Sequence, residues 1–186
     1  MSIISLSLLA LTSFVAADEQ SKLHVLNKPQ KAVPEDWTVV FCARGTSIKD
    51  KSVFGHAFIA LVYNDEKKKA CVQRAIGFFP EKEGDALPSA FGPVPGTVVE
   101  DFLRNKPASG TCRLIVRVDR PQYDTVGKVL TDWNKKDFQL VKNNCVSFVH
   151  AVAEALKLKM PDRRGLDQLP FRYVQKLTES NGKAEK

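Results

Sequence analysis

The chain has 186 residues, a length that suits one domain, and its 44% hydrophobic and 26% charged residues are ordinary for a globular protein. The net charge of +7 favours anionic partners such as cell-wall polymers, acidic lipids or nucleic acid. The basic residues are spread along the chain and form no basic-aromatic stripe, so nucleic-acid binding is not expected.

The first residues have the pattern of a secretion signal. Residues 1–17 are uncharged and mostly apolar, and they end in the small residues Ala16 and Ala17. This pattern predicts a signal peptide that is removed before Asp18, although no lysine or arginine precedes the apolar run. The run is too short to span a membrane comfortably. We therefore expect a secreted protein, either extracellular or periplasmic.

The remaining chain is expected to form a single domain over residues 35–180. Residues 18–34 are polar and contain two prolines, which predicts a flexible lead-in, and residues 181–186 form a polar tail. Apolar runs with short polar links predict an antiparallel sheet with strands near residues 37–42, 55–63, 70–79 and 111–118. The other expected elements are a surface loop over 80–96, helices over 98–105, 121–135 and 170–178, a short strand over 138–141, and a helix that begins at Cys145.

The stretch around Cys145 carries the strongest chemical signal. After Cys145, apolar residues recur at Phe148, Val149 and Val152, which is helical spacing, and Asn144 is a favoured helix N-cap. Cys145 would then lie in the first turn, where free main-chain N–H groups and the helix dipole favour a thiolate. The alternative is that Cys145 is simply a small buried residue of the apolar stripe.

The cysteines limit the disulfide pattern without fixing it. The chain contains Cys42, Cys71, Cys112 and Cys145, and an even number in a secreted protein suggests disulfides. If Cys145 is a free nucleophile, three cysteines remain and at most one intramolecular bridge forms. We expect Cys71–Cys112, because these residues would lie on neighbouring strands. In the alternative, a fully bridged scaffold, Cys145 is structural.

His56 is the expected partner of Cys145. It follows Gly55 at the start of an apolar strand, and a strand histidine that faces a cysteine at a helix start can take and return the thiol proton. A core histidine is the alternative interpretation. His150 would point away from the Cys145 side of its helix. The histidines and cysteines do not form the closely spaced pairs typical of zinc sites, so neither a metal nor another cofactor is expected.

Two motifs carry a family resemblance. Gly55-His56-Ala57-Phe58-Ile59, followed far downstream by the segment Asn143-Asn144-Cys145-Val146-Ser147-Phe148-Val149, resembles the NlpC-like papain-fold superfamily. Because the histidine strand precedes the cysteine helix, the resemblance is to the circularly permuted branch. It implies an α+β fold, with an antiparallel sheet packed on the helix that starts at the catalytic cysteine.

The resemblance also implies an activity and a third site residue. The family hydrolyses or transfers amide, ester or thioester groups through an acyl-thioester. A polar residue on the strand after the histidine strand often orients the imidazole, and Gln73 matches that place, although a histidine, asparagine or aspartate is more usual there. An ordinary solvated strand residue is the alternative interpretation of Gln73.

These features together predict a secreted, monomeric cysteine peptidase or amidase acting on bacterial cell-wall peptides (peptidoglycan), an anionic substrate that suits the positive charge. One alternative is a lipid-directed thiol hydrolase or acyltransferase of the same fold. For this alternative, Leu87 and Phe91 in the loop over 80–96 would supply a membrane-surface contact. The other alternative is a secreted binding module without catalytic activity.

Overall fold

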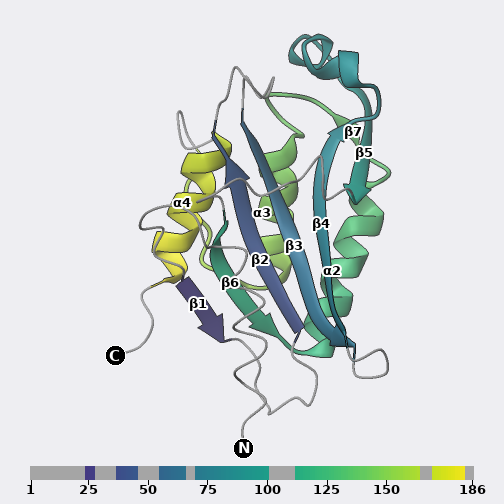
Figure 1. Ribbon diagram of the computed structural model, residues 1–186. Helices are drawn as coiled ribbons and strands as arrows, with labels where there is room; N and C mark the ends of the chain where they lie inside the picture. Colours follow the sequence, from purple (N-terminus) through teal and green to yellow (C-terminus); the bar gives the residue numbers. More distant parts are fainter. Residues whose placement is uncertain are drawn as a thin grey trace, which may run out of the picture.

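The computed structural model describes residues 24–27, 37–45, 55–65, 70–100, 112–163 and 169–182. The protein is α+β, with a seven-stranded sheet in the order β1-β6-β2-β3-β4-β5-β7 and three helices on one face of it (Figure 1). The strands are β1 His24–Asn27, β2 Trp37–Arg44, β3 His56–Asp65, β4 Ala70–Pro80, β5 Val94–Glu100, β6 Cys112–Val118 and β7 Asp137–Phe138. The helices are α2 Arg120–Trp133, α3 Cys145–Ala155 and α4 Pro170–Asn181, together with the short 3-10 helices η1 Glu83–Ala86 and η2 Pro88–Ala90.

The sheet confirms the four long strands that the sequence predicts. Strands β6, β2, β3, β4, β5 and β7 pair antiparallel, whereas β1 runs parallel to β6 at the edge. Strand β1 lies within residues 18–34, so the prediction of a flexible lead-in is wrong for residues 24–27. The predicted signal segment lies outside the described residues.

The segment between β4 and α2 departs from the prediction in two places. Residues 98–100, expected to begin a short helix, belong to strand β5, because Val98 pairs with Phe78 and Val99 with Gly77 on β4. The expected loop over 80–96 contains η1 and η2 and the start of β5. In both places, pairing to the exposed edge of β4 decides the structure, and local propensity does not reveal it.

The sheet is buried on both faces, which explains its continuous apolar strands. In β3, Ala57, Ile59 and Leu61 belong to the larger core beneath the helices. The alternate residues Phe58 and Ala60 belong to a second buried cluster, which also holds Val40, Cys42, Val62 and Ile115.

Helix α3 begins and packs as the sequence predicts. The Asn144 side chain caps it, since its Oδ1 accepts hydrogen bonds from the main-chain N–H groups of Val146 (2.9 Å) and Ser147 (3.0 Å). Phe148 and Val152 are fully buried in the core between α3 and the sheet. The first turn of α3 is therefore fixed by its cap and by its apolar face.

The cysteine prediction is correct in one part and wrong in another. Cys145 is a free cysteine, as expected, which excludes a scaffold that includes it in a bridge. Cys42 is disulfide-bonded, and the β2–β6 register places Cys112 directly opposite it. Cys71 lies on β4, and strands β2 and β3 separate β4 from β6. Three strand spacings are roughly 14 Å, beyond the reach of a disulfide, so the predicted Cys71–Cys112 bridge is wrong.

Candidate active site

The candidate site lies at one end of the sheet, the upper end in Figure 1. Strand β2 ends there at Arg44, which pairs with His56 at the start of β3. The ladder between β3 and β4 begins at the Phe58–Gly77 pair, so His56 and Ala57 precede it. The Cys145 sulfur lies here, close enough to the main-chain N–H of Ala57 for that group to favour the thiolate. The start of α3 and the start of β3 therefore lie side by side. The His56 ring, however, stacks with Phe58 on the side of β3 away from the Ala57 side on which α3 packs.

Three main-chain N–H groups act on the Cys145 sulfur. They belong to Ala57, Val146 and Cys145 itself, and each favours the thiolate, as does the positive charge of Arg44. Burial nevertheless has the largest effect and raises the pKa of the Cys145 thiol above its usual value. The helix start therefore favours the thiolate, as the sequence predicts, but burial outweighs this effect. Because burial raises the pKa of the thiol, a neighbouring base would assist its conversion to a nucleophile.

His56 is buried and held by aromatic rings. Its imidazole stacks on Phe79 of β4, with ring centroids 4.2 Å apart, and lies 5.9 Å from the Phe58 ring. Gly55, immediately before it, has φ +70°, and a Cβ at this position would lie 2.6 Å from the Arg44 carbonyl oxygen. Glycine therefore permits the close approach of β2 at this point.

Gln73 does not fit the predicted role of orienting His56. The β3–β4 register places it opposite Val62, six residues along β3 from His56. At a rise of about 3.3 Å per residue, the two Cα atoms are roughly 20 Å apart, too far for the side chains to meet. Phe79 is the β4 residue that contacts the imidazole. The error arises because the sequence identifies the strand and leaves its register open.

Arg44 is a site residue that the sequence analysis missed. It is partly buried, its Nε is fully buried, and it is the cross-strand neighbour of His56. Its charge lowers the pKa of the Cys145 thiol, against the larger effect of burial. An arginine that ends an otherwise apolar strand is a usable sequence signal, because a charge is costly to bury without a function or a partner.

His150, the rejected alternative to His56, is bound elsewhere. Its Nδ1 and the Tyr173 hydroxyl oxygen of α4 are 2.8 Å apart in a hydrogen bond. Burial lowers the pKa of His150, and the positive charge of Arg163 acts in the same direction. Nearby, Arg163 Nη2 donates to Ser147 Oγ at 2.7 Å, and Ser147 Oγ donates to the Lys142 carbonyl. These contacts connect α3 to α4 and to the segment after α3.

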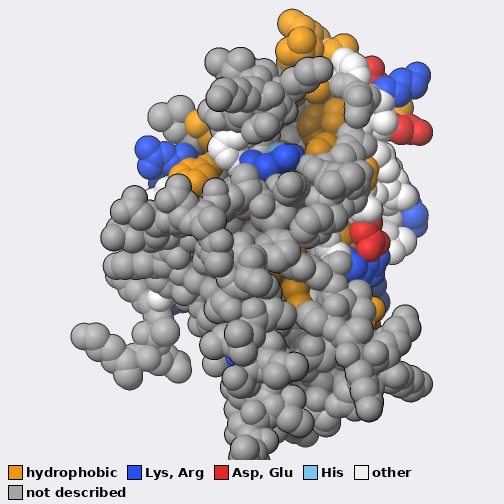
Figure 2. Space-filling model, viewed as in Figure 1, with side chains coloured by type: hydrophobic (Ala, Val, Ile, Leu, Met, Phe, Trp, Pro, Cys, Tyr) orange, Lys and Arg blue, Asp and Glu red, His pale blue; other side chains and the backbone are white. Residues whose placement is uncertain are grey.

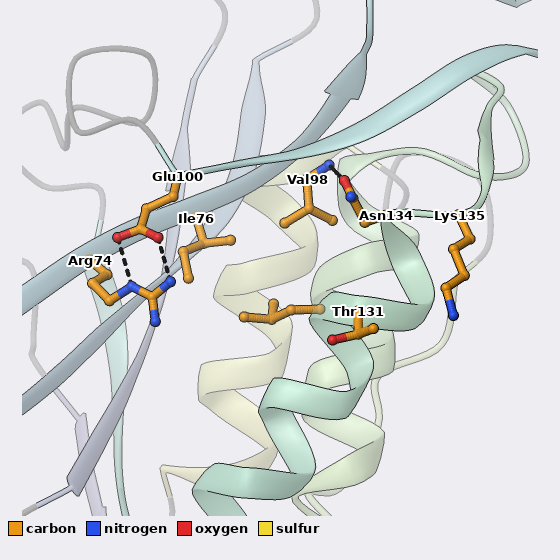
Figure 3. A pocket seen from close by; sticks show the side chains of 8 residues that line it. Arg74, Ile76, Val98, Glu100, Thr131, Asn134 and Lys135 are labelled. Carbon is orange, nitrogen blue, oxygen red and sulfur yellow. Dashed lines mark hydrogen bonds and ion pairs between the residues drawn. The ribbon is translucent and has the colours of Figure 1, made fainter.

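A groove of about 340 Å³ lies between α2 and strands β4 and β5, and none of its lining residues belongs to the Cys145 site (Figure 3). Arg74 of β4 and Glu100 of β5 form a two-bond ion pair on the sheet side of the groove, and this pair lowers the pKa of Glu100. Asn134 Oδ1 accepts a hydrogen bond from the Val98 main-chain N–H at 2.9 Å. Arg74, Glu100 and Asn134 are therefore already engaged within the groove, which makes the groove a weaker candidate for chemistry.

Comparison with protein-family models, curated proteins and solved structures found no match to this chain. Within the described parts of the chain, no three histidine, cysteine or acidic side chains lie together as metal ligands. None of the helices in those parts is both long and apolar enough to cross a membrane. The function must therefore be argued from the Cys145 site itself.

Proposed function

We propose that the protein is a cysteine hydrolase with a papain-like arrangement, in which Cys145 is the nucleophile and His56 the general base. One observation carries the proposal: the free Cys145 thiol, at the start of α3, lies beside the main-chain N–H of Ala57, the residue that follows His56. An α+β fold in which the cysteine helix packs on an antiparallel sheet also agrees with the resemblance in the two motifs.

The mechanism follows from a thiol that is protonated at rest. In the proposed first step, the His56 imidazole turns from the Phe58 side of β3 toward the sulfur at the open end of the sheet. It accepts the Sγ proton as the sulfur attacks the substrate carbonyl, a C–S bond forms, and the carbonyl oxygen becomes an oxyanion. Main-chain N–H groups at the helix start, including that of Cys145, stabilise the oxyanion. The amine or alcohol then leaves with the proton from His56. Water, deprotonated by His56, cleaves the acyl-thioester, and the proton returns to Cys145.

Arg44 supports this chemistry by its charge. Sulfur becomes negative whenever His56 holds the proton, and a positive guanidinium close by stabilises that state. Arg44 acts through Cys145 and is a positioning residue in this mechanism. Phe79 stacks on the imidazole and would orient His56, the role that the sequence suggested for Gln73.

The substrate class that we propose first is the peptide of bacterial cell walls. The net charge of +7 suits an anionic wall, and the apolar segment over residues 1–17 suits a secreted, monomeric protein that meets it outside the cytoplasm. The alternative, a lipid-directed thiol hydrolase, is favoured by one observation. The end of the molecule that holds Cys145 exposes large apolar side chains.

Digestion of purified cell walls, followed by mass spectrometry of the released fragments, tests the wall-peptide proposal. The wild-type protein should release new amine and carboxyl ends within the stem peptides, and Cys145→Ala should release none. Phospholipid vesicles are assayed in parallel for released fatty acid. If neither substrate is cleaved by the wild-type protein, the proposal fails in favour of a binding module. If only the phospholipid is cleaved, the wall-peptide substrate is wrong and the cysteine mechanism stands.

A further inference from the structure

The exposed apolar side chains of the described residues are not spread over the surface. Four large ones are exposed, namely Leu87 (66%), Phe91 (94%), Val141 (58%) and Leu169 (43%). Leu87 and Phe91 follow the end of β4, Val141 precedes the start of α3, and Leu169 is the N-cap residue of α4. All four therefore lie at the end of the molecule where Cys145 lies (Figure 1).

The placement of Leu169 rests on the direction of α4. Asn181, the last residue of α4, exchanges two hydrogen bonds of 2.8 Å with the main chain of Lys159, beyond the end of α3. Both helices thus end together, at the end of the sheet away from Cys145, and both begin at the Cys145 end. Scattered exposed apolar residues are normal in proteins, but their collection at one end indicates a surface that is covered in use.

Leu87 and Phe91, which we call the apolar tip, are held outward by a hydrogen-bonded base. Ser89 between them is fully buried, its Oγ donates to the Ala86 carbonyl at 2.6 Å, and its own carbonyl accepts from the Leu140 N–H at 3.1 Å. The Phe91 N–H donates to the Pro88 carbonyl at 3.0 Å. Figure 2 shows apolar side chains gathered at the top of the molecule, over the region of η1 and η2 in Figure 1.

We propose that this end of the molecule docks on a lipid bilayer, with Phe91 and Leu87 of the apolar tip inserted at the acyl-chain boundary. The tip is convex, so it suits a deformable lipid surface better than a partner protein, which would need a matching pocket. The net charge of +7 attracts the molecule as a whole to anionic headgroups, whereas the segment that carries the tip is itself acidic, with Glu81, Glu83 and Asp85 against one lysine. Val141 and Leu169 would lie beside the tip at the same surface.

Docking would bring the lipid surface close to the candidate nucleophile. Phe79, which stacks on His56, is joined to the tip through Pro80, η1 and η2. Docking would therefore favour the lipid-directed alternative, in which esters, amides or thioesters of acyl chains are cleaved, over the wall peptide. This last step rests on the proposed cysteine hydrolase, whereas the docking itself does not depend on catalysis.

Sedimentation with vesicles of phosphatidylcholine, with and without phosphatidylglycerol, tests the docking. The wild-type protein should bind both, more tightly with phosphatidylglycerol, and Phe91→Ser should weaken binding by about tenfold or more. Phe91→Leu, the matched control, should keep most of the affinity because it keeps an apolar side chain. Since Phe91 is almost fully exposed, neither change should alter the thermal melting temperature.

Cys145→Ala separates docking from catalysis, because it should bind vesicles like the wild-type protein while losing any hydrolysis. Equal vesicle binding by the wild-type protein and Phe91→Ser, or no binding by either, would overturn the docking proposal. So would a wild-type dimer that Phe91→Ser converts to a monomer without vesicles, because the tip would then bind a second copy of the chain.

Discussion

Helix α3 holds two titratable side chains in contrasting surroundings, Cys145 at its first residue and His150 near its middle. Burial favours the neutral form of both, since it raises the pKa of the thiol and lowers that of the imidazole. Their partners differ. His150 is held by the Tyr173 hydroxyl, whereas main-chain N–H groups and the charge of Arg44 act on Cys145.

This difference separates a structural from a chemical side chain. The Tyr173 hydroxyl forms a fixed hydrogen bond between two helices, and nothing in that contact requires the imidazole to change charge. The groups around Cys145 stabilise a negative charge that the resting thiol does not carry. In the proposed mechanism, that negative charge appears when His56 takes the thiol proton.

Replacement of each histidine gives the largest expected contrast. His56→Ala should reduce turnover by about 10²- to 10⁴-fold, the usual contribution of a general base, whereas His150→Ala should leave turnover nearly unchanged. Initial rates on the substrate found in the wall or lipid assay measure both variants. If His150→Ala lost most of its turnover and His56→Ala kept full activity, His150 would be the general base and the proposed roles of the two histidines would be reversed.

The next largest expected effect is a loss of stability when Gly55, which has a positive φ, is replaced. Gly55→Ala should lower the free energy of unfolding by about 1–3 kcal/mol, because the new Cβ would strain the backbone and crowd the Arg44 carbonyl. Gly127 in α2 is the matched control, since a Cβ there meets nothing within 4 Å, and Gly127→Ala should be neutral or stabilising. Urea unfolding measures both, and equal effects would contradict the close approach of β2 at Gly55.

The lowered pKa of His150 predicts a pH dependence of stability. Below the unfolded-state pKa of about 6.5, the unfolded chain takes up a proton that the folded protein accepts only at lower pH. The free energy of unfolding is therefore unaffected by His150 above that pKa, and it declines as the pH falls toward the folded-state pKa. Urea unfolding at several pH values should show this decline, and His150→Gln should flatten it. If the stability of His150→Gln declined with falling pH as steeply as that of the wild-type protein, another group would cause the decline.

The smallest expected effect is the loss of stability when the Arg74–Glu100 ion pair in the groove is broken. Both side chains are partly exposed, so Glu100→Gln should cost less than about 1 kcal/mol of unfolding free energy. Because the pKa of Glu100 is lowered, its contribution is present above the unfolded-state pKa and is lost as the pH falls through the folded-state value. Thermal melting near neutral pH checks the size. A substantial loss of turnover in Glu100→Gln would connect the groove to the chemistry.

The sequence predicts the elements of this protein better than their arrangement. Continuous apolar runs identify β2, β3 and β4, because both faces of the sheet are buried, and Asn144 with the spacing after it identifies the start of α3. The β1–β6 pair is not predictable in this way. Strand β6 lies between β1 and β2, far from its neighbours in the sequence. This non-sequential order also explains why the predicted Cys71–Cys112 bridge is wrong.

The site is predictable to the same extent. Residue type and position identify Cys145 and His56, whose elements the fold brings together. The errors concern properties that depend on register and burial. Arg44 becomes a site residue only through its pairing with His56, Gln73 is excluded only by its pairing with Val62, and the pKa of the Cys145 thiol depends on burial that the sequence does not give.

The rate of Cys145 alkylation by iodoacetamide as a function of pH, compared in the wild-type protein, His56→Ala and His150→Ala, tests the central claim most directly. It needs no substrate. The wild-type profile should have its midpoint above the usual thiol pKa of 9.0, because burial raises the pKa. His56→Ala should slow the reaction near neutral pH by about tenfold or more, since the base is lost, and His150→Ala should match the wild-type protein. A profile that His150→Ala changes and His56→Ala leaves intact would contradict the account.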